Sequence, residues 1–219
     1  MHNVTVAFAA LLVMLLSYFF GCFNGSFMVS HFIIRDDVRK HGSGNAGLTN
    51  FYRTYGAKYA LLVIACDMGK TVAACLLGSF FFRCLGWDGT LGTLLAGLGC
   101  ELGHIFPVFY GFRGGKGILS GGTLVLLLNW RVAAVAWALF LLLWLTTRYV
   151  SLASITATCS APITVYFVYG HNWLYTGLCL AVAALVVWCH RENIQRLLHG
   201  TEKKFKWHVN PMEGKDPPK

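Results

Sequence analysis

Long apolar runs alternate along the chain with short polar segments that carry most of its charge. A membrane-spanning helix needs about 20 predominantly apolar residues. Six runs are close to that length and a seventh has eleven residues: 4–29, 59–82, 91–110, 118–128, 132–147, 152–169 and 173–189. The pattern predicts an all-α integral membrane protein with seven transmembrane helices.

The eleven-residue run, 118–128, could instead be re-entrant or merge with its neighbour. The distribution of charge favours a full span. With seven spans, most of the 18 Lys and Arg residues fall on one side, Arg83 and Arg131 fall on the other, and Lys70 lies within the bilayer. With six spans the basic tail would move outside, against the positive-inside rule. We therefore expect the N-terminus outside and the C-terminus in the cytoplasm.

The domain organisation follows from the same pattern. Residues 1–209 are expected to form a single seven-helix membrane domain, and the polar residues 210–219 are expected to form a disordered cytoplasmic tail. No internal repeat is visible, so the sequence gives no support to an inverted-repeat transporter.

Composition supports the membrane assignment and narrows the partners. The chain is 56% hydrophobic and only 12% charged, whereas soluble domains carry about a quarter charged residues. Its net charge of +9 comes from segments without a basic, aromatic-interleaved module. We therefore expect the lipid bilayer and phosphorylated substrates as partners rather than nucleic acid. The Cys and His residues lack metal-ligand spacing, and neither a CoA nor a nucleotide fingerprint is present, so we expect no metal and no cofactor.

The first segment with candidate chemistry is the polar loop 41–50, which is followed by Arg53. Its glycines, Gly42, Gly44 and Gly47, allow backbone N–H groups to turn toward an anion. Ser, Asn and Thr side chains add short donors, and Arg53 adds a planar fork for phosphate oxygens. An ordinary connection between two helices does not need this many glycines and short polar side chains, so the composition favours a functional loop.

The second segment, 111–117, places Lys116 between glycines immediately before the predicted helix that starts at Ile118. Bare amides, one point charge and a helix N-terminus together resemble a phosphate cradle. The alternative is a tight turn that carries positive-inside charges.

The third segment, 190–204, places His190, Asn193 and Arg196 on one helical face. By itself it also fits an amphipathic helix lying on anionic headgroups.

Charged residues also occur inside the predicted spans, where they are expensive and suggest function by default. Asp67 and Lys70 can pair at i,i+3 spacing, as can Glu101 and His104. The alternative is that these pairs hold helices together.

Taken together, these segments resemble the bacterial acyl-phosphate:glycerol-3-phosphate acyltransferase family. The resemblance runs from about residue 25 to residue 204. Its matching stretches are 42–45 with Thr49, Asn50 and Arg53, then 103–109 running into 114–117, and finally 190–198. The resemblance implies an enzyme that transfers an acyl group from a long-chain acyl phosphate to the 1-hydroxyl of glycerol 3-phosphate. The products are 1-acyl-glycerol 3-phosphate (lysophosphatidic acid) and phosphate, at the first step of bacterial phospholipid synthesis.

The resemblance also implies a location, a partner and a set of site residues. The expected location is the bacterial inner (plasma) membrane, as a multi-pass protein with its active site on the cytoplasmic face. The enzyme that produces acyl phosphate is an expected partner. The expected catalytic residues are Ser43, Arg53, Lys116, His190 and Asn193. The expected substrate-binding residues are Gly44, Asn45, Thr49, Asn50, His104, Gly114, Gly115, Gly117, Ser154 and Arg196. Ser154 and its neighbour Ser151 are the weaker candidates.

The expected mechanism does not use the His-x-x-x-x-Asp pair of other glycerolipid acyltransferases, which this sequence lacks. An acyl phosphate is a mixed anhydride with a good leaving group, so positioning and electrostatic stabilisation should supply much of the rate. Two other classes remain open from the residues alone: a transporter or channel for a phosphorylated small molecule, and a membrane scaffold.

Overall fold

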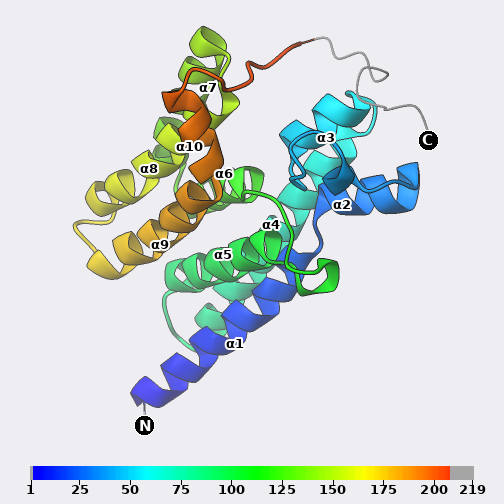
Figure 1. Cartoon of the computed structure of the whole chain (residues 1–219). Coiled ribbons are helices and arrows are strands. Elements are labelled where there is room, and N and C mark those ends of the chain that lie inside the picture. Colours follow the sequence, from blue (N-terminus) through cyan, green and yellow to red (C-terminus); the bar gives the residue numbers. More distant parts are fainter. Residues whose placement is uncertain (1, 208–219) are drawn as a thin grey trace.

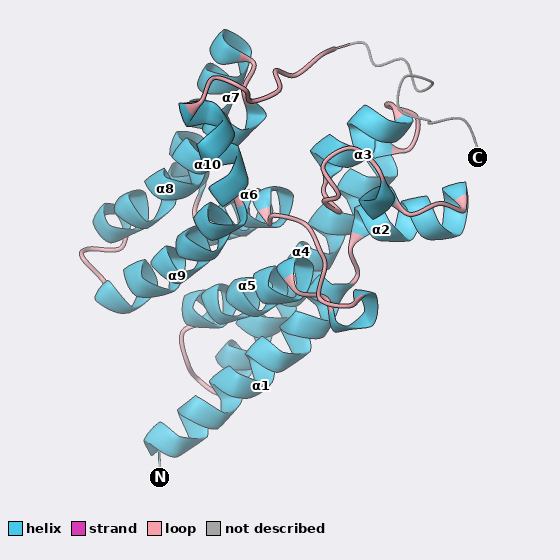
Figure 2. Ribbon diagram, in the orientation of Figure 1, coloured by secondary structure: helices cyan, strands magenta, loops and turns pink. Residues whose placement is uncertain are grey.

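The computed structural model describes residues 2–207 as a helical protein without a β-strand in that range (Figure 2). All seven predicted apolar runs are helical. They correspond to α1 (His2–Cys22), α4 (Ala60–Cys84), α5 (Gly89–Ile105), α6 (Ile118–Leu128), α7 (Trp130–Thr147), α8 (Val150–Val168) and α9 (Trp173–Cys189). Shorter helices are α2 (Gly25–Met28), a π-helix (Val29–Ile34), 3-10 turns (Val38–Lys40 and Val108–Tyr110), α3 (Leu48–Tyr55) and α10 (Arg191–Leu198). The predicted tail 210–219 lies outside the described residues.

Length and composition allow five of the described segments to cross a membrane. A sixth is added if α9 and α10, which bend by 59° where they join, count as one span. α6 has only 11 residues. Its last turn nevertheless reaches the end of α8, because the hydroxyl of Tyr169 donates to the carbonyl of Leu128 over 2.7 Å. The structure therefore establishes a multi-pass architecture, while seven spans and the side on which each terminus lies stay predictions.

α5 is the central helix of the bundle and packs against α1, α4, α6 and α9 (Figure 1). In its most apolar stretch 78% of the residues are buried, compared with 17–39% in the other four long spans. Small residues bring α5 close to α1, because a Cβ atom at Gly103 would overlap the carbonyl of Tyr18. Such close backbone approach is typical of helix pairs in membranes.

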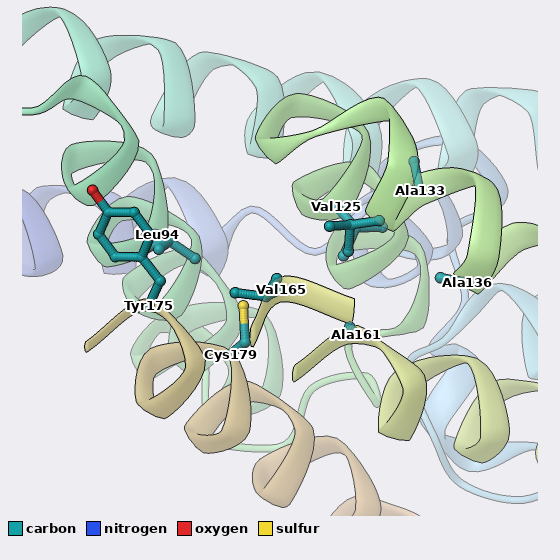
Figure 3. Packing of buried hydrophobic residues seen from close by; sticks show 9 residues of the cluster. Leu94, Val125, Ala133, Ala136, Ala161, Val165, Tyr175 and Cys179 are labelled. Carbon is teal, nitrogen blue, oxygen red and sulfur yellow. The ribbon is translucent and has the colours of Figure 1, made fainter. Parts of the chain in front are cut away.

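The second half of the chain, α6 to α9, packs around an apolar cluster that also includes Leu94 of α5 (Figure 3). Val125, Val165 and Cys179 contribute from α6, α8 and α9. Large apolar side chains such as Phe8, Leu142 and Phe167 remain more than half exposed on the outer surface, as expected for helices whose outer faces meet lipid.

A buried ionic cluster fixes the break between α1 and α2. The ammonium of Lys70 lies 2.8 Å from the carboxylate of Asp67 and donates to the carbonyls of Gly21 and Phe23 over 3.1 Å each. Asp67 also accepts from the backbone N–H of Gly25 over 3.0 Å. These bonds satisfy backbone groups that the helix break frees, as lipid surroundings require. They support the interpretation that Asp67 and Lys70 hold helices together.

Candidate active site

The three polar segments that the sequence singles out come together at one end of the bundle. The backbone N–H of Ala46, in the first loop, donates to the carbonyl of Gly114, in the second, over 3.2 Å. The side-chain amide of Asn45 reaches the same carbonyl over 3.4 Å. Lys116 in turn donates to Asn193 of α10. The site is therefore built from residues far apart in the sequence.

Asn50 shapes the first loop from within. Its amide nitrogen donates to the carbonyls of Val38, His41 and Asn45 over 3.0–3.1 Å, and its amide oxygen accepts from the backbone N–H of Ser43 over 3.0 Å. The side chain is buried and its hydrogen-bonding groups are occupied. Asn50 was expected to contact the substrate directly, but its amide is engaged in hydrogen bonds within the loop.

The other predicted residues of this loop lie nearer the surface. Gly44 has φ +70°, a left-handed conformation that glycine adopts without strain. Ser43 is exposed beside it, and Thr49 is half-buried in the first turn of α3. The Ser43 and Thr49 side chains are thus accessible from outside the loop. Contact of these three residues with a ligand stays a prediction.

The glycines of the second loop are needed for close packing. The N–H groups of Gly114 and Gly115 donate to the carbonyls of Ile105 and His104 over 3.1 and 3.0 Å. A Cβ atom at Gly115 would overlap the His104 ring, and one at Gly117 would overlap the carboxylate of Glu101. The expectation that the amides of Gly114 and Gly115 face a phosphate is therefore wrong for this conformation, because both are engaged with the end of α5.

His104 lies beneath this loop and is 3% exposed. Its Nδ1 atom lies 2.7 Å from the Lys70 ammonium and 3.6 Å from the Asp67 carboxylate. His104 was expected to bind substrate, but here it connects the buried ionic cluster to the loop that carries Lys116.

Three polar side chains converge on Glu202, which follows α10. Its Oε1 atom accepts from the Ser151 hydroxyl and from the Asn193 amide, and its Oε2 atom accepts from Nε of Arg196, each over 2.7 Å. The opposite end of the Asn193 amide accepts from Lys116. These residues, from the loop before α6, from α8, from α10 and from the segment after it, form the floor of the candidate site.

Arg53 reaches toward the same floor from α3. Its Nη2 atom donates to the carbonyl of Lys203 over 3.1 Å. Burial lowers the pKa of the Arg53 guanidinium, while the Glu202 charge raises it and Arg196 lowers it. Arg53 thus bonds a residue 150 positions away in the sequence and is electrostatically coupled to Glu202, which brings α3 and the segment after α10 together.

The charged side chains around the candidate site favour the binding of an anion. Burial lowers the pKa of the Lys116 ammonium, and the neighbouring charge of Arg196 lowers it further. Burial raises the pKa of the Glu202 carboxyl, but hydrogen bonds from Arg196, Asn193 and Ser151 outweigh it, so the pKa is held below its ordinary value. Three cations, Arg53, Lys116 and Arg196, therefore surround the Glu202 carboxylate, which is ionised near neutral pH, and the exposed Glu192 carboxylate lies 3.9 Å from Arg196. A phosphate group would complete the charge balance.

Two predicted residues lie deeper at the same end. His190, 4% exposed, has Nδ1 2.8 Å from the carbonyl of Val186. A carbonyl only accepts, so Nδ1 carries the proton and a neutral ring leaves Nε2 as an acceptor. Ser154 is 2% exposed, and its hydroxyl has no hydrogen-bond partner within residues 2–207.

The sequence analysis did not name Glu202, and it named Ser151, which donates to Glu202, only as a weaker candidate. One sequence signal could have pointed to Glu202. It is the one acidic residue in the basic stretch 199–206, where a carboxylate is expected to pair with cations. The described residues contain no group of three or more His, Cys, Asp or Glu side chains that could hold a metal ion.

Comparisons with known proteins find relatives that cover most of the chain. The family described as glycerol-3-phosphate acyltransferase matches residues 11–200. The glycerol-3-phosphate acyltransferase of Syntrophomonas wolfei is 40% identical over 197 residues, which cover 90% of this chain and 96% of the relative. That of Finegoldia magna is 38% identical, covering 86% and 92%.

Two solved structures are also similar. They are crystal structures of PlsY (YgiH), described as an integral membrane glycerol 3-phosphate acyltransferase. The glycerol 3-phosphate form has a TM-score of 0.79 and 37% identity, covering 90% of this chain and 96% of that chain. The lysophosphatidic acid form has a TM-score of 0.77 and 36% identity, covering 90% and 95%.

Proposed function

Because the chain belongs to the glycerol-3-phosphate acyltransferase family, we propose that it transfers an acyl group from a long-chain acyl phosphate to the 1-hydroxyl of sn-glycerol 3-phosphate. The products are 1-acyl-glycerol 3-phosphate, which is lysophosphatidic acid, and phosphate. Family membership favours this acyltransferase over a transporter or a scaffold. The observation that carries the proposal is the convergence of Arg53, Lys116 and Arg196 on one polar floor.

In the proposed reaction the 1-hydroxyl oxygen forms a bond to the acyl carbon, and the bond from that carbon to the phosphate oxygen breaks. The hydroxyl proton passes to the leaving phosphate, so the substrate itself accepts it. Both substrates carry phosphate, and the cations hold them in contact while charge develops on the leaving group. The donor needs little further activation because it is a mixed anhydride.

The proposed roles follow from where the side chains lie. Arg53 and Lys116 hold phosphate oxygens, and Asn193 and Ser43 donate hydrogen bonds. The Nε2 atom of His190 is an acceptor that helps bind the hydroxyl or pass its proton. Gly44, Asn45, Thr49, Asn50, His104, Gly114, Gly115, Gly117, Ser154 and Arg196 shape or line the substrate site, several of them through the loop contacts described above.

The proposed setting is the bacterial plasma membrane. Residues 1–209 form one domain, with seven spans, an outside N-terminus and the site on the cytoplasmic face, where glycerol 3-phosphate and the enzyme that makes acyl phosphate are located. α6 supports this topology, since it starts next to Lys116 and its last turn contacts the end of α8. The apolar chain of the donor lies in the adjoining lipid leaflet.

The test is an assay of the pure protein in detergent with radiolabelled glycerol 3-phosphate. We expect labelled lysophosphatidic acid with palmitoyl phosphate and little or none with palmitoyl-CoA. Lys116→Ala protein purified identically controls for acyltransferases of the expression host. Comparable turnover with palmitoyl-CoA in the absence of acyl phosphate would refute the choice of donor, and no product with either donor would refute the activity.

A further inference from the structure

After α10 the chain turns and runs to α3, where Lys203 and Trp207 make hydrogen bonds with Arg53 and Tyr52. Gly200 adopts φ +67°, and the N–H of Thr201 donates to the carbonyl of Arg196 over 2.8 Å. This turn directs residues 203–207, here named the aromatic strap, from α10 past the end of α7 toward the side of α3 (Figure 1). The strap is extended, without helix, so other elements must hold it in place.

Two backbone contacts anchor the strap to opposite sides of the site. The N–H of Phe205 donates to the carbonyl of Arg148, between α7 and α8, over 2.8 Å. The hydroxyl of Tyr52, on α3, donates to the carbonyl of Trp207 over 2.7 Å. The strap therefore connects the half of the bundle that carries α10 to the half that carries α3.

Aromatic packing centres on Phe205. Its ring stacks on Tyr52 with centroids 5.4 Å apart and planes 21° apart. On its other side it meets Trp144 of α7 edge-on at 5.3 Å. These separations are typical of favourable aromatic pairs. The Phe205 ring thus contacts both α3 and α7, and Trp207 packs beside it on Trp144 with centroids 5.1 Å apart.

The consequence falls on Arg53, the residue after Tyr52. Its guanidinium donates to the carbonyl of Lys203 over 3.1 Å, two residues before Phe205. A planar guanidinium fork binds phosphate best when it is already oriented. The strap contacts α3 at two places. Trp207 bonds Tyr52, the neighbour of Arg53, and the carbonyl of Lys203 accepts from the Arg53 guanidinium itself.

We propose that Phe205 is a positioning residue that clamps the aromatic strap between Tyr52 and Trp144 and thereby orients Arg53 for a substrate phosphate. The ligand part of this inference rests on the proposed function. The contact between the strap and Arg53 does not, and it can be measured without turnover.

The first experiment measures the accessibility of Arg53 with phenylglyoxal, which modifies free guanidinium groups. The extent of modification of each Arg-containing peptide is read by mass spectrometry. In Phe205→Ala protein we expect Arg53 to react several-fold faster than in wild type, while the exposed Arg113 reacts at an unchanged rate. An unchanged rate at Arg53 would overturn the proposal.

The second experiment is a double-mutant cycle on kcat/KM. We expect Phe205→Ala to lower kcat/KM by about 5- to 20-fold, with much of the loss recovered by Phe205→Tyr, since orientation contributes through geometry. In an Arg53→Ala background the same change should cost less than about twofold, because Arg53 is no longer there to orient. An equal loss in both backgrounds would overturn the proposal, since Phe205 would then act elsewhere.

Folding is controlled within the same set of variants. Phe80→Ala removes a phenyl group from the exposed face of α4, where the ring is 66% exposed, and should leave both readouts at wild-type values. If Phe205→Ala lowers the melting temperature, Phe205→Leu keeps the apolar volume and is measured in its place. If wild type makes no lysophosphatidic acid, the proposed function fails, and the phenylglyoxal rates still decide whether the strap orients Arg53.

Discussion

The ammonium of Lys70 lies 2.7 Å from Nδ1 of His104, inside the bundle between α4 and α5. An ammonium has no acceptor, so Nδ1 accepts and the ring proton sits on Nε2, which faces Gly115. The buried ionic cluster is thereby in contact with the loop that carries Lys116. The buried charge of Lys70 therefore supports the loop that carries Lys116 through the ring of His104.

Breaking the buried pair should destabilise the whole protein. Asp67→Asn leaves the Lys70 charge without its carboxylate, and Lys70→Met leaves Asp67 without its ammonium. Each change should cost about 3–5 kcal/mol, since an uncompensated charge then remains buried. Thermal unfolding in detergent measures the loss. The double variant should lose less than the sum of the two single variants, and strict additivity would show that the two side chains do not act as a pair.

Gly115→Ala should reduce both stability and activity. The added methyl group overlaps a His104 ring that Lys70 and Asp67 hold in place, and overpacking of this kind costs about 1–3 kcal/mol. The matched control is Gly69→Ala on α4, where an added Cβ meets nothing within 4 Å. That change should leave stability equal or raise it by about 0.5–1 kcal/mol, because alanine favours the helix. Equal melting temperatures for all three proteins would contradict the packing argument.

Removing either proposed phosphate ligand should lower kcat/KM. A charge-assisted hydrogen bond contributes roughly 1.5–3 kcal/mol, so Lys116→Ala should cost about 10- to 150-fold if the bond tightens in the transition state. Arg53→Ala should cost as much or more, and Arg53→Lys should recover only part, since an ammonium cannot reproduce the fork. Steady-state kinetics on folded, purified variants provide the measurement.

Arg191→Ala is the control for that series, because Arg191 is exposed and its guanidinium lies over the Trp188 ring at 4.4 Å. It should retain near wild-type efficiency. If all the basic residues instead have equal and weak effects, binding to anionic headgroups is their role. Near wild-type efficiency for both Lys116→Ala and Arg53→Ala would rule out the phosphate site.

The alkaline limb of the pH profile of kcat/KM should report Lys116 in the free enzyme. Burial and Arg196 both lower the pKa of Lys116, whereas Glu202 raises it. Arg196→Gln removes a like charge, so the limb should move to higher pH. Glu202→Gln removes an opposite charge, so the limb should move to lower pH. Shifts of both variants in the same direction would exclude Lys116 as the titrating group.

The topology can be tested by labelling single cysteines in intact cells, after the eight native cysteines are replaced. With seven spans, His199→Cys lies in the cytoplasm and should resist an impermeant reagent. Trp173→Cys, at the 73% exposed start of α9, lies outside and should react. Reaction at position 199 from the outside would contradict the model of seven spans.

Apolar periodicity and motif content were enough to locate the helices. All seven apolar runs proved helical, because about 20 apolar residues in lipid must satisfy their backbone hydrogen bonds within the segment. The family was also visible in the motifs, and the family match over residues 11–200 confirmed it. These are local properties, which a sequence carries whatever the tertiary packing.

The sequence by itself therefore determined a helical membrane protein, its family, and Arg53, Lys116 and Asn193 as residues of interest. Only the tertiary structure decided how they are arranged. The sequence suggested that the Gly115 amide faces a phosphate, but its N–H donates to the carbonyl of His104. Glu202 belongs to the candidate site because it accepts from Ser151, 51 residues away. The physical reason is that a hydrogen-bonding group acts on whatever lies within about 3 Å of it, and in a bundle those neighbours come from distant helices.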